Sequence, residues 1–120
     1  MRRIEIGVIN PQDERQALRK WAARVDAGEI MPNAESQLSF ATYSQLHSAL
    51  TNKRMELLEC VAQHEGMNIR KLAGQIGRDY KNVYDDVQLL IQLGLIEKQG
   101  KVLFAPYDDI NIHKSLRKAA

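Results

Sequence analysis

The chain has 120 residues, which suits one compact domain with a short extension and is enough to bury a core without disulfides or a metal. Its content of 44% hydrophobic and 27% charged residues is ordinary for a soluble globular protein, and no apolar run approaches the ~20 residues that cross a bilayer, so no membrane partner is expected. The single cysteine, Cys60, excludes an internal disulfide, and the charged start argues against a signal peptide, so a cytoplasmic location is expected.

The first 37 residues predict a strand-helix extension. Residues 4–9 are typical of a short strand that ends at Asn10-Pro11. A helix is predicted over about 12–27, closed by Gly28, with apolar residues at helical spacing: Leu18, Trp21, Ala22 and Val25. The stretch from 29 to 37 is typical of a connection. This extension is our candidate for dimerisation or for binding a partner.

A sharper pattern follows from residue 38 onward. Residues 38–40 are expected to be extended, and a short helix is expected over about 42–50. Three helices then follow: one capped by Thr51 or Asn52 and running to about 64, one over about 70–76, and one over about 80–93 capped by Asp79. Strands are predicted over 95–99 and 102–105, joined by a turn at Gly100-Lys101.

This order of elements indicates a fold class that is mainly α with a small β-hairpin wing. Two short helices joined by a turn that contains Gly77 are typical of a helix-turn-helix, and a hairpin directly after them makes a winged version. We therefore expect a winged helix-turn-helix over residues 38–110. Residues 111–120 are expected to be a basic tail, which either contacts phosphates or is a solvated end.

The third helix can be divided into two faces at 100° per residue. Val83, Val87, Leu90 and Ile91 form one apolar arc that is expected to pack on the other helices. The opposite side carries polar side chains near the start of the helix, and these are the residue types that contact base edges and phosphates: Arg78, Lys81, Asn82, Tyr84, Asp85 and Gln88. Because any exposed helix carries a polar face, this face alone is weak evidence for DNA binding. The order of the elements, with an exposed third helix followed by a hairpin, is what favours DNA binding here.

Charge near this face is mixed. The formal net charge is +2, and residues 51–104 hold eight Lys/Arg and seven Asp/Glu, so a DNA site must arise from local arrangement. Asp85 and Asp86 would repel phosphates unless they accept from cytosine N4 or pair with Lys81 or Arg78. On the hairpin, Lys98 and Lys101 either reach phosphate or the minor groove, or belong to a plain solvated hairpin.

The run from Leu72 to Val83, continued by Leu93-Gly94-Leu95-Ile96-Glu97, resembles a group of small bacterial and archaeal winged-helix proteins described as transcriptional regulators. Some members lie beside toxin genes as antitoxins, and the wider fold is similar to MarR-type and ArsR-type regulators. The resemblance covers roughly residues 38–110. It implies that Arg78, Lys81 and Asn82 contact DNA. The sequence departs from it at Tyr84-Asp85, where a more basic pair would be expected.

These observations favour a DNA-binding regulator over an enzyme. Cys60 and the three histidines show no metal-ligand spacing, and no phosphate loop or catalytic constellation is present, so neither cofactor nor metal is expected. The expected function is sequence-specific binding to double-stranded DNA. We expect the protein to be a repressor that acts as a homodimer, because two-fold pairing doubles the length of the DNA site. The alternative is a protein-interaction module, such as an antitoxin that binds a cognate toxin.

Overall fold

The computed structural model describes residues 2–8, 19, 36–114 and 116. They fall into two compact units, one made of residues 48–108 and the other of the described residues among 2–47 and 109–116. The helix expected over 12–27 lies outside the described residues, apart from Arg19.

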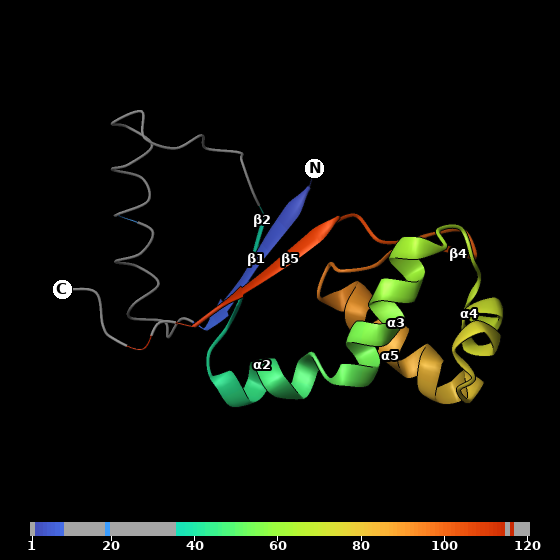
Figure 1. Ribbon diagram of the computed structural model, residues 1–120, viewed down its shortest axis with the longest axis horizontal. Coiled ribbons are helices and arrows are strands. Elements are labelled where there is room, and N and C mark those ends of the chain that lie inside the picture. The colour runs from blue at the N-terminus through green and yellow to red at the C-terminus, as the bar shows by residue number, and fades with distance from the viewer. Residues whose placement is uncertain (1, 9–18, 20–35, 115, 117–120) are drawn as a thin grey trace. The chain divides into compact units, whose positions relative to one another are not determined.

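Three helices form most of the first unit: α3 (Asn52–Gln63), α4 (Ile69–Ile76) and α5 (Tyr80–Gln92) (Figure 1). Each begins where a short polar side chain caps it, because the first N–H groups of a helix lack partners within it. Thr51 accepts a hydrogen bond from the Arg54 N–H at 3.3 Å, and Asn68 accepts one from the Lys71 N–H at 2.8 Å. The three helices are confirmed, with bounds that differ from the prediction by one residue.

The core of this unit is built from the apolar stripes of the three helices and from the hairpin that follows them. On each helix the buried residues lie one, three, four or seven positions apart, which puts them on a single face. The buried residues are Leu50, Leu57, Leu58, Val61, Ile69, Leu72, Ala73, Val83, Val87, Leu90, Leu95, Ile96 and Leu103. Of the four residues predicted to form the apolar arc of α5, Ile91 is only half-buried.

The predicted hairpin is present as β3 (Glu97–Gln99) and β4 (Val102–Phe104), which pair antiparallel. Gly100 supplies the positive φ of 64° that the two-residue turn needs. The hairpin is anchored by Leu103, whose N–H donates to the carbonyl of Met67 at 2.9 Å and whose carbonyl accepts from the Gly66 N–H at 2.9 Å. Leu95 and Ile96 were expected to be in the first strand, but they lie before it and belong to the core.

The second unit contains a sheet that corrects the expected fold class. β1 (Arg3–Val8) lies between β2 (Ser36–Phe40) and β5 (Asp109–His113), and both neighbours are parallel to it (Figure 1). The protein is therefore mixed α/β rather than mainly α. The strands at 4–9 and 38–40 were predicted, but β5 was not, and the expected boundary between residues 110 and 111 falls inside it. A short helix, α2 (Tyr43–Ala49), follows β2 as predicted.

The two faces of this sheet differ in polarity. Ile4 and Ile6 of β1 are buried, and the register places Leu38 of β2 and Ile112 of β5 beside Ile6 on the same face. The other face carries polar pairs, among them the ion pair between Arg3 Nε and Asp109 Oδ2 at 3.1 Å. Because both edges of β1 are occupied, the strand that the sequence suggested for dimerisation offers no backbone edge to a second chain.

The two glycines at the end of α4 are expected to respond oppositely to alanine. Gly77 has a φ of 66°, which a side chain disfavours, so Gly77→Ala should lower the free energy of unfolding by about 1 kcal/mol. Gly74 lies inside α4, and a Cβ there meets nothing within 4 Å, so Gly74→Ala should raise that free energy by about 0.5–1 kcal/mol. Urea denaturation measures both. Equal shifts for the two variants would contradict the left-handed turn.

Candidate nucleic-acid interface

The turn between α4 and α5 fixes where α5 begins. Gly77 is left-handed and ends α4, and the Arg78 N–H donates to the carbonyl of Ala73 at 3.0 Å. Asp79 then caps α5, with its carboxylate accepting from the Asn82 N–H at 3.4 Å. The turn is thus only three residues long, from 77 to 79, and it holds the first turn of α5 in a defined direction.

Helix α5 is sharply divided into a buried and an exposed face. Val83, Val87 and Leu90 are 0% exposed. The helical period places Lys81 and Asp85 on the opposite side, and both are exposed. The other predicted site residues of α5 lie on the flanks of that side: Asn82 and Tyr84 are exposed, and Gln88 is half-buried.

Arg78 differs from the other predicted site residues because its guanidinium is engaged inside the protein. Its Nη2 donates to Asp86 Oδ2 at 2.7 Å, and its side chain is 21% exposed. Arg54 of α3 donates to the other oxygen of Asp86 at 2.9 Å. One of the pairings considered for the two aspartates, that of Asp86 with Arg78, is confirmed. The same contact assigns Arg78 a structural role.

The electrostatics of Asp86 follow from these two guanidinium groups. Burial by itself would raise the pKa of Asp86, but the hydrogen bonds and charges of Arg78 and Arg54 outweigh it and hold that pKa below its usual value. Asp86 is therefore ionised whenever the protein is folded near neutral pH. Asp85, its neighbour, is exposed, and within the described part of the chain it has no hydrogen bond or ion pair.

Two tyrosines lie side by side on the flank of α5, four residues apart. The rings of Tyr80 and Tyr84 have centroids 6.3 Å apart and are tilted by 31°. Tyr80 is 49% exposed and Tyr84 is 42% exposed, so the two rings together form a small exposed aromatic surface. The sequence analysis did not include Tyr80 among the site residues. The i, i+4 spacing to Tyr84 was the signal that could have identified it.

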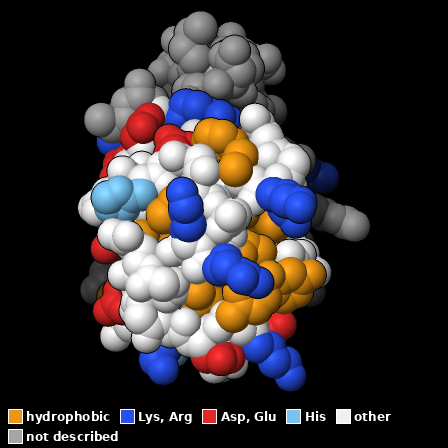
Figure 2. All heavy atoms as spheres, turned by 90° about the vertical axis from the view of Figure 1, so that its right-hand side faces the viewer, with side chains coloured by type: hydrophobic (Ala, Val, Ile, Leu, Met, Phe, Trp, Pro, Cys, Tyr) orange, Lys and Arg blue, Asp and Glu red, His pale blue; other side chains and the backbone are white. Residues whose placement is uncertain are grey.

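Helix α4 adds two cations that the sequence analysis also left out. Ile69, Leu72 and Ala73 are its buried residues, so Arg70 and Lys71 are exposed on its first turn. Figure 2 looks onto the side of the first unit where α4 lies, and it shows Lys and Arg side chains spread over this surface with hydrophobic surface between them. The buried i, i+3, i+4 pattern in the sequence was sufficient to place both cations outside.

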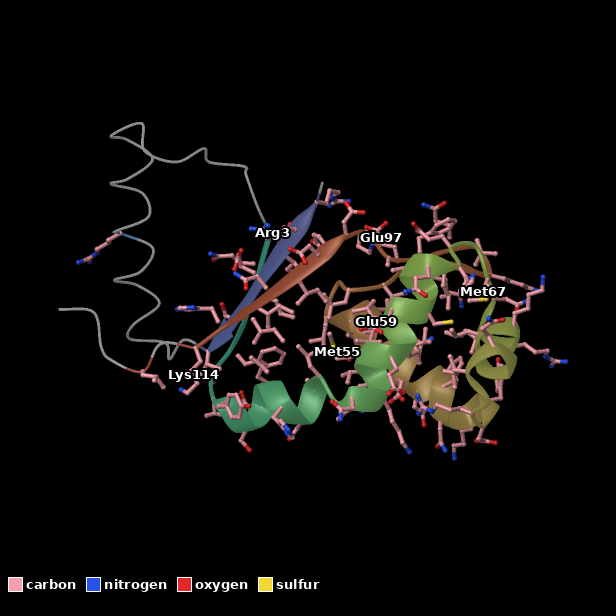
Figure 3. All side chains as sticks on the ribbon, viewed as in Figure 1. Arg3, Met55, Glu59, Met67, Glu97 and Lys114 are labelled. Atoms are coloured by element: carbon pink, nitrogen blue, oxygen red, sulfur yellow. The ribbon has the colours of Figure 1, made fainter. Side chains whose placement is uncertain are left out.

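The hairpin presents its two lysines to solvent. Lys98 lies on β3 opposite Leu103, and Lys101 lies in the turn after Gly100; both are exposed. Figure 3 labels Met67 in the link that leads into α4, and its backbone holds Leu103 of β4 as described above. The lysines are therefore carried by a hairpin that is fixed to the helical core rather than by an isolated loop.

The described part of the chain also bears on whether the protein has a metal site, a reactive thiol or a membrane-spanning helix. No group of three or more His, Cys, Asp or Glu residues there is arranged to hold a metal ion. Cys60 is half-buried, and burial raises the pKa of its thiol, which disfavours the reactive thiolate. None of the helices described is both long and apolar enough to cross a membrane.

Comparison with known protein families gives a match. The model of the HVO_A0114 family matches residues 49–112, which is more than half of the chain. The chain belongs to the HVO_A0114 family. The HVO_A0114 region begins just before the Thr51 cap of α3 and ends within β5, so it contains the three helices and the hairpin. No curated protein and no solved structure matches the chain.

Removal of the Asp86 carboxylate is expected to destabilise the first unit. Asp86→Asn leaves two half-buried guanidinium groups without their counterion, so the free energy of unfolding at neutral pH should fall by about 1–3 kcal/mol. The matched control is Asp85→Asn, which removes an exposed carboxylate without a described partner and should change it by less than about 0.5 kcal/mol.

The loss of unfolding free energy caused by Asp86→Asn should depend on pH in a defined direction. The folded-state pKa of Asp86 is lowered, so its stabilisation is complete above the unfolded pKa of about 3.9 and disappears as pH falls through the folded value. Urea titrations of wild type and Asp86→Asn should therefore differ at pH 7 and converge as the pH drops below about 4. A gap that is constant with pH would show that the carboxylate charge is not the cause.

Proposed function

We propose that residues 48–108 form a winged helix-turn-helix that binds double-stranded DNA sequence-specifically and regulates transcription, most simply as a repressor. The supporting observation is the division of α5: its buried stripe is fully enclosed, while the opposite side exposes Lys81 and Asp85, with Asn82 and Tyr84 on the flanks. A helix that is second in a helix-turn-helix and polar on its outer side suits the major groove. The hairpin after it then takes the place of the wing.

The exposed side chains of α5 match the donor and acceptor patterns of base edges. Lys81 donates, which suits the O6 and N7 acceptors of guanine or a phosphate, and the Asn82 amide suits adenine. When it is ionised, the Asp85 carboxylate accepts hydrogen bonds but cannot donate them. In the major groove it therefore suits the N4 amino group of cytosine, which donates. Tyr84 offers an apolar ring for a thymine methyl group, and Gln88 lies one turn further along.

Cations on the neighbouring elements suit the phosphate backbone. Arg70 and Lys71 stand on the first turn of α4, the helix that crosses the backbone in this motif. Lys98 and Lys101 stand on the hairpin and suit phosphates or the minor groove. Arg78 acts in this proposal as a positioning residue, because its ion pair with Asp86 holds the start of α5.

The deciding experiment is fluorescence anisotropy of the purified protein with duplex DNA from the region upstream of its own gene. We expect tighter binding to this DNA than to a shuffled duplex, and an affinity that falls with salt in proportion to the number of phosphate contacts. Equal and weak binding to both duplexes, lost at physiological salt, would overturn the proposal.

Lys81→Ala tests which helix reads the DNA. If Lys81 contacts a base, the substitution should weaken specific binding by about 1–3 kcal/mol, or roughly 5- to 150-fold. Lys53→Ala removes another exposed lysine, from α3, and should leave the specificity ratio between the two duplexes unchanged. Binding that Lys81→Ala does not alter would show that α5 is not the recognition helix.

A second candidate is a protein-binding module, such as an antitoxin that binds a cognate toxin, and the tyrosine pair favours it. Exposed tyrosines that lie together are enriched at protein interfaces, and the outer side of α5 has no excess of positive charge. Tyr80→Ala alone discriminates the two functions, because Tyr84 is one of the side chains that we propose to contact DNA. If the protein partner binds there, co-purification of the product of the adjacent gene should be lost while binding to upstream DNA persists.

A further inference from the structure

Asp85 has no structural role that the described part of the chain accounts for. It is exposed, and it forms neither a hydrogen bond nor an ion pair with a described residue. It lies beyond the first turn of α5, which contains no acidic residue, so it neither caps the helix nor complements the positive end of the helix dipole. Aspartate is also a poor helix former, so this side chain costs α5 stability without a contact that offsets the cost.

The neighbouring cation does not engage Asp85 either. Lys81 precedes Asp85 by about one helical turn and lies on the same exposed side of α5. Oppositely charged residues four apart can pair on a helix, but the order in which the cation comes first is the less favourable one. Lys81, like Asp85, has no hydrogen bond or ion pair with a described residue. One donor and one acceptor of opposite charge thus stand unengaged on the side that we propose to enter the major groove.

The four bases differ in what they present to a carboxylate in the major groove. Guanine presents the acceptors N7 and O6, and thymine presents the acceptor O4, so both repel a carboxylate. Adenine presents its N6 donor beside the N7 acceptor, whereas cytosine presents the N4 donor without an acceptor of its own. A carboxylate on α5 therefore favours cytosine largely by being repelled from the other bases, and phosphates repel it as well.

We propose that Asp85 determines the sequence specificity of α5, because it selects a cytosine and lowers the affinity for every DNA site that lacks a cytosine at that position. This inference rests on the proposed DNA-binding function and adds to it which contact discriminates between sites. Lys81 lies about 6 Å from Asp85 along the helix axis, and base pairs are about 3.4 Å apart. In a helix that runs along the groove, the two side chains therefore suit a guanine and a cytosine on base pairs one or two apart.

Selection of binding sites by the full chain tests the proposal. The protein is mixed with duplexes that carry a randomised central segment, and the retained duplexes are sequenced. Wild type should enrich a motif that contains a cytosine, and Asp85→Asn should change that position toward adenine, because an amide both donates and accepts. Asp85→Ala should accept any base there. The other positions of the motif should be the same for all three proteins.

Fluorescence anisotropy with defined duplexes measures the effect on affinity. When the selected cytosine is replaced by thymine, wild type should bind about tenfold more weakly, whereas the affinity of Asp85→Ala should change by less than about twofold. Asp85→Ala should also bind a shuffled duplex about two- to fivefold more tightly than wild type does, because one charge that phosphates repel is gone.

Glu59→Gln is the control matched for charge. It removes one exposed negative charge from α3, outside the exposed side of α5 (Figure 3). We expect it to enrich the same motif as wild type and to keep the tenfold preference for cytosine over thymine. A loss of this preference in Glu59→Gln would show that net charge, rather than the position of Asp85, sets the specificity, and it would overturn the proposal.

Failure of this inference is distinguishable from failure of the proposed function. If wild type enriches a motif without cytosine, or if both Asp85 variants enrich the wild-type motif with the same preference at every position, Asp85 does not determine specificity and DNA binding still stands. If wild type enriches no motif at all, sequence-specific binding is itself contradicted and the role of Asp85 is contradicted with it.

Discussion

The ion-pair cluster around Asp86 is the interaction on which the geometry of the first unit depends. Its two carboxylate oxygens receive guanidinium groups from two different places in the chain, Arg54 in the first turn of α3 and Arg78 in the turn before α5. Arg54 also donates to the carbonyls of Ser48 and Ala49 at the end of α2, at 2.8 Å and 3.0 Å. One side chain on α5 therefore links the end of α2, the start of α3 and the α4–α5 turn. Hydrophobic packing holds the helices together without fixing direction, whereas these hydrogen bonds require one orientation.

The two adjacent aspartates of α5 show how this cluster bears on recognition. Asp86 is directed to the two arginines, and a step of 100° around the helix directs Asp85 away from them. The negative charge of Asp86 is balanced within the protein, while that of Asp85 is not balanced by any described residue. If α5 enters the major groove, Asp85 lowers non-specific attraction to phosphates and raises the dependence on a correctly placed donor. The weak net positive charge and the exposed Asp85 thus fit a protein whose affinity for DNA comes more from contacts with bases than from general attraction to phosphates.

The sequence was sufficient for elements whose contacts are local, and insufficient for those whose partners are remote. Capping residues and buried spacing predicted α3, α4 and α5, and Gly100 predicted the hairpin turn. The alternation of Ile110 and Ile112 was present in the sequence too, but it is short and did not by itself predict a strand. The partner of β5 is remote, because Asn111 of β5 contacts Glu5 of β1 across 106 residues. Parallel strands are usually continuous apolar runs, and these alternate, so the pattern did not indicate a parallel sheet.

The assignment of Arg78 was limited in the same way. A cation before a helix in a helix-turn-helix suits a phosphate, and only the position of Asp86 eight residues later shows that it is engaged internally. Conversely, Tyr80 and the two cations of α4 were recoverable from helical spacing alone, because exposure follows directly from which residues are buried. Local periodicity thus predicts which side chains are exposed, and tertiary contacts decide which of the polar ones remain available.

The order of the strands along the chain implies that the first unit assists the formation of the sheet. β1 and β5 are separated in sequence by the whole of the HVO_A0114 helical region, and joining them in an unfolded chain has a large loop-closure cost. Helices and a tight hairpin form from contacts close in sequence, so we expect residues 48–108 to fold before the sheet does. Once folded, they replace a long flexible loop with a compact one and lower the entropy cost of pairing β1 with β5.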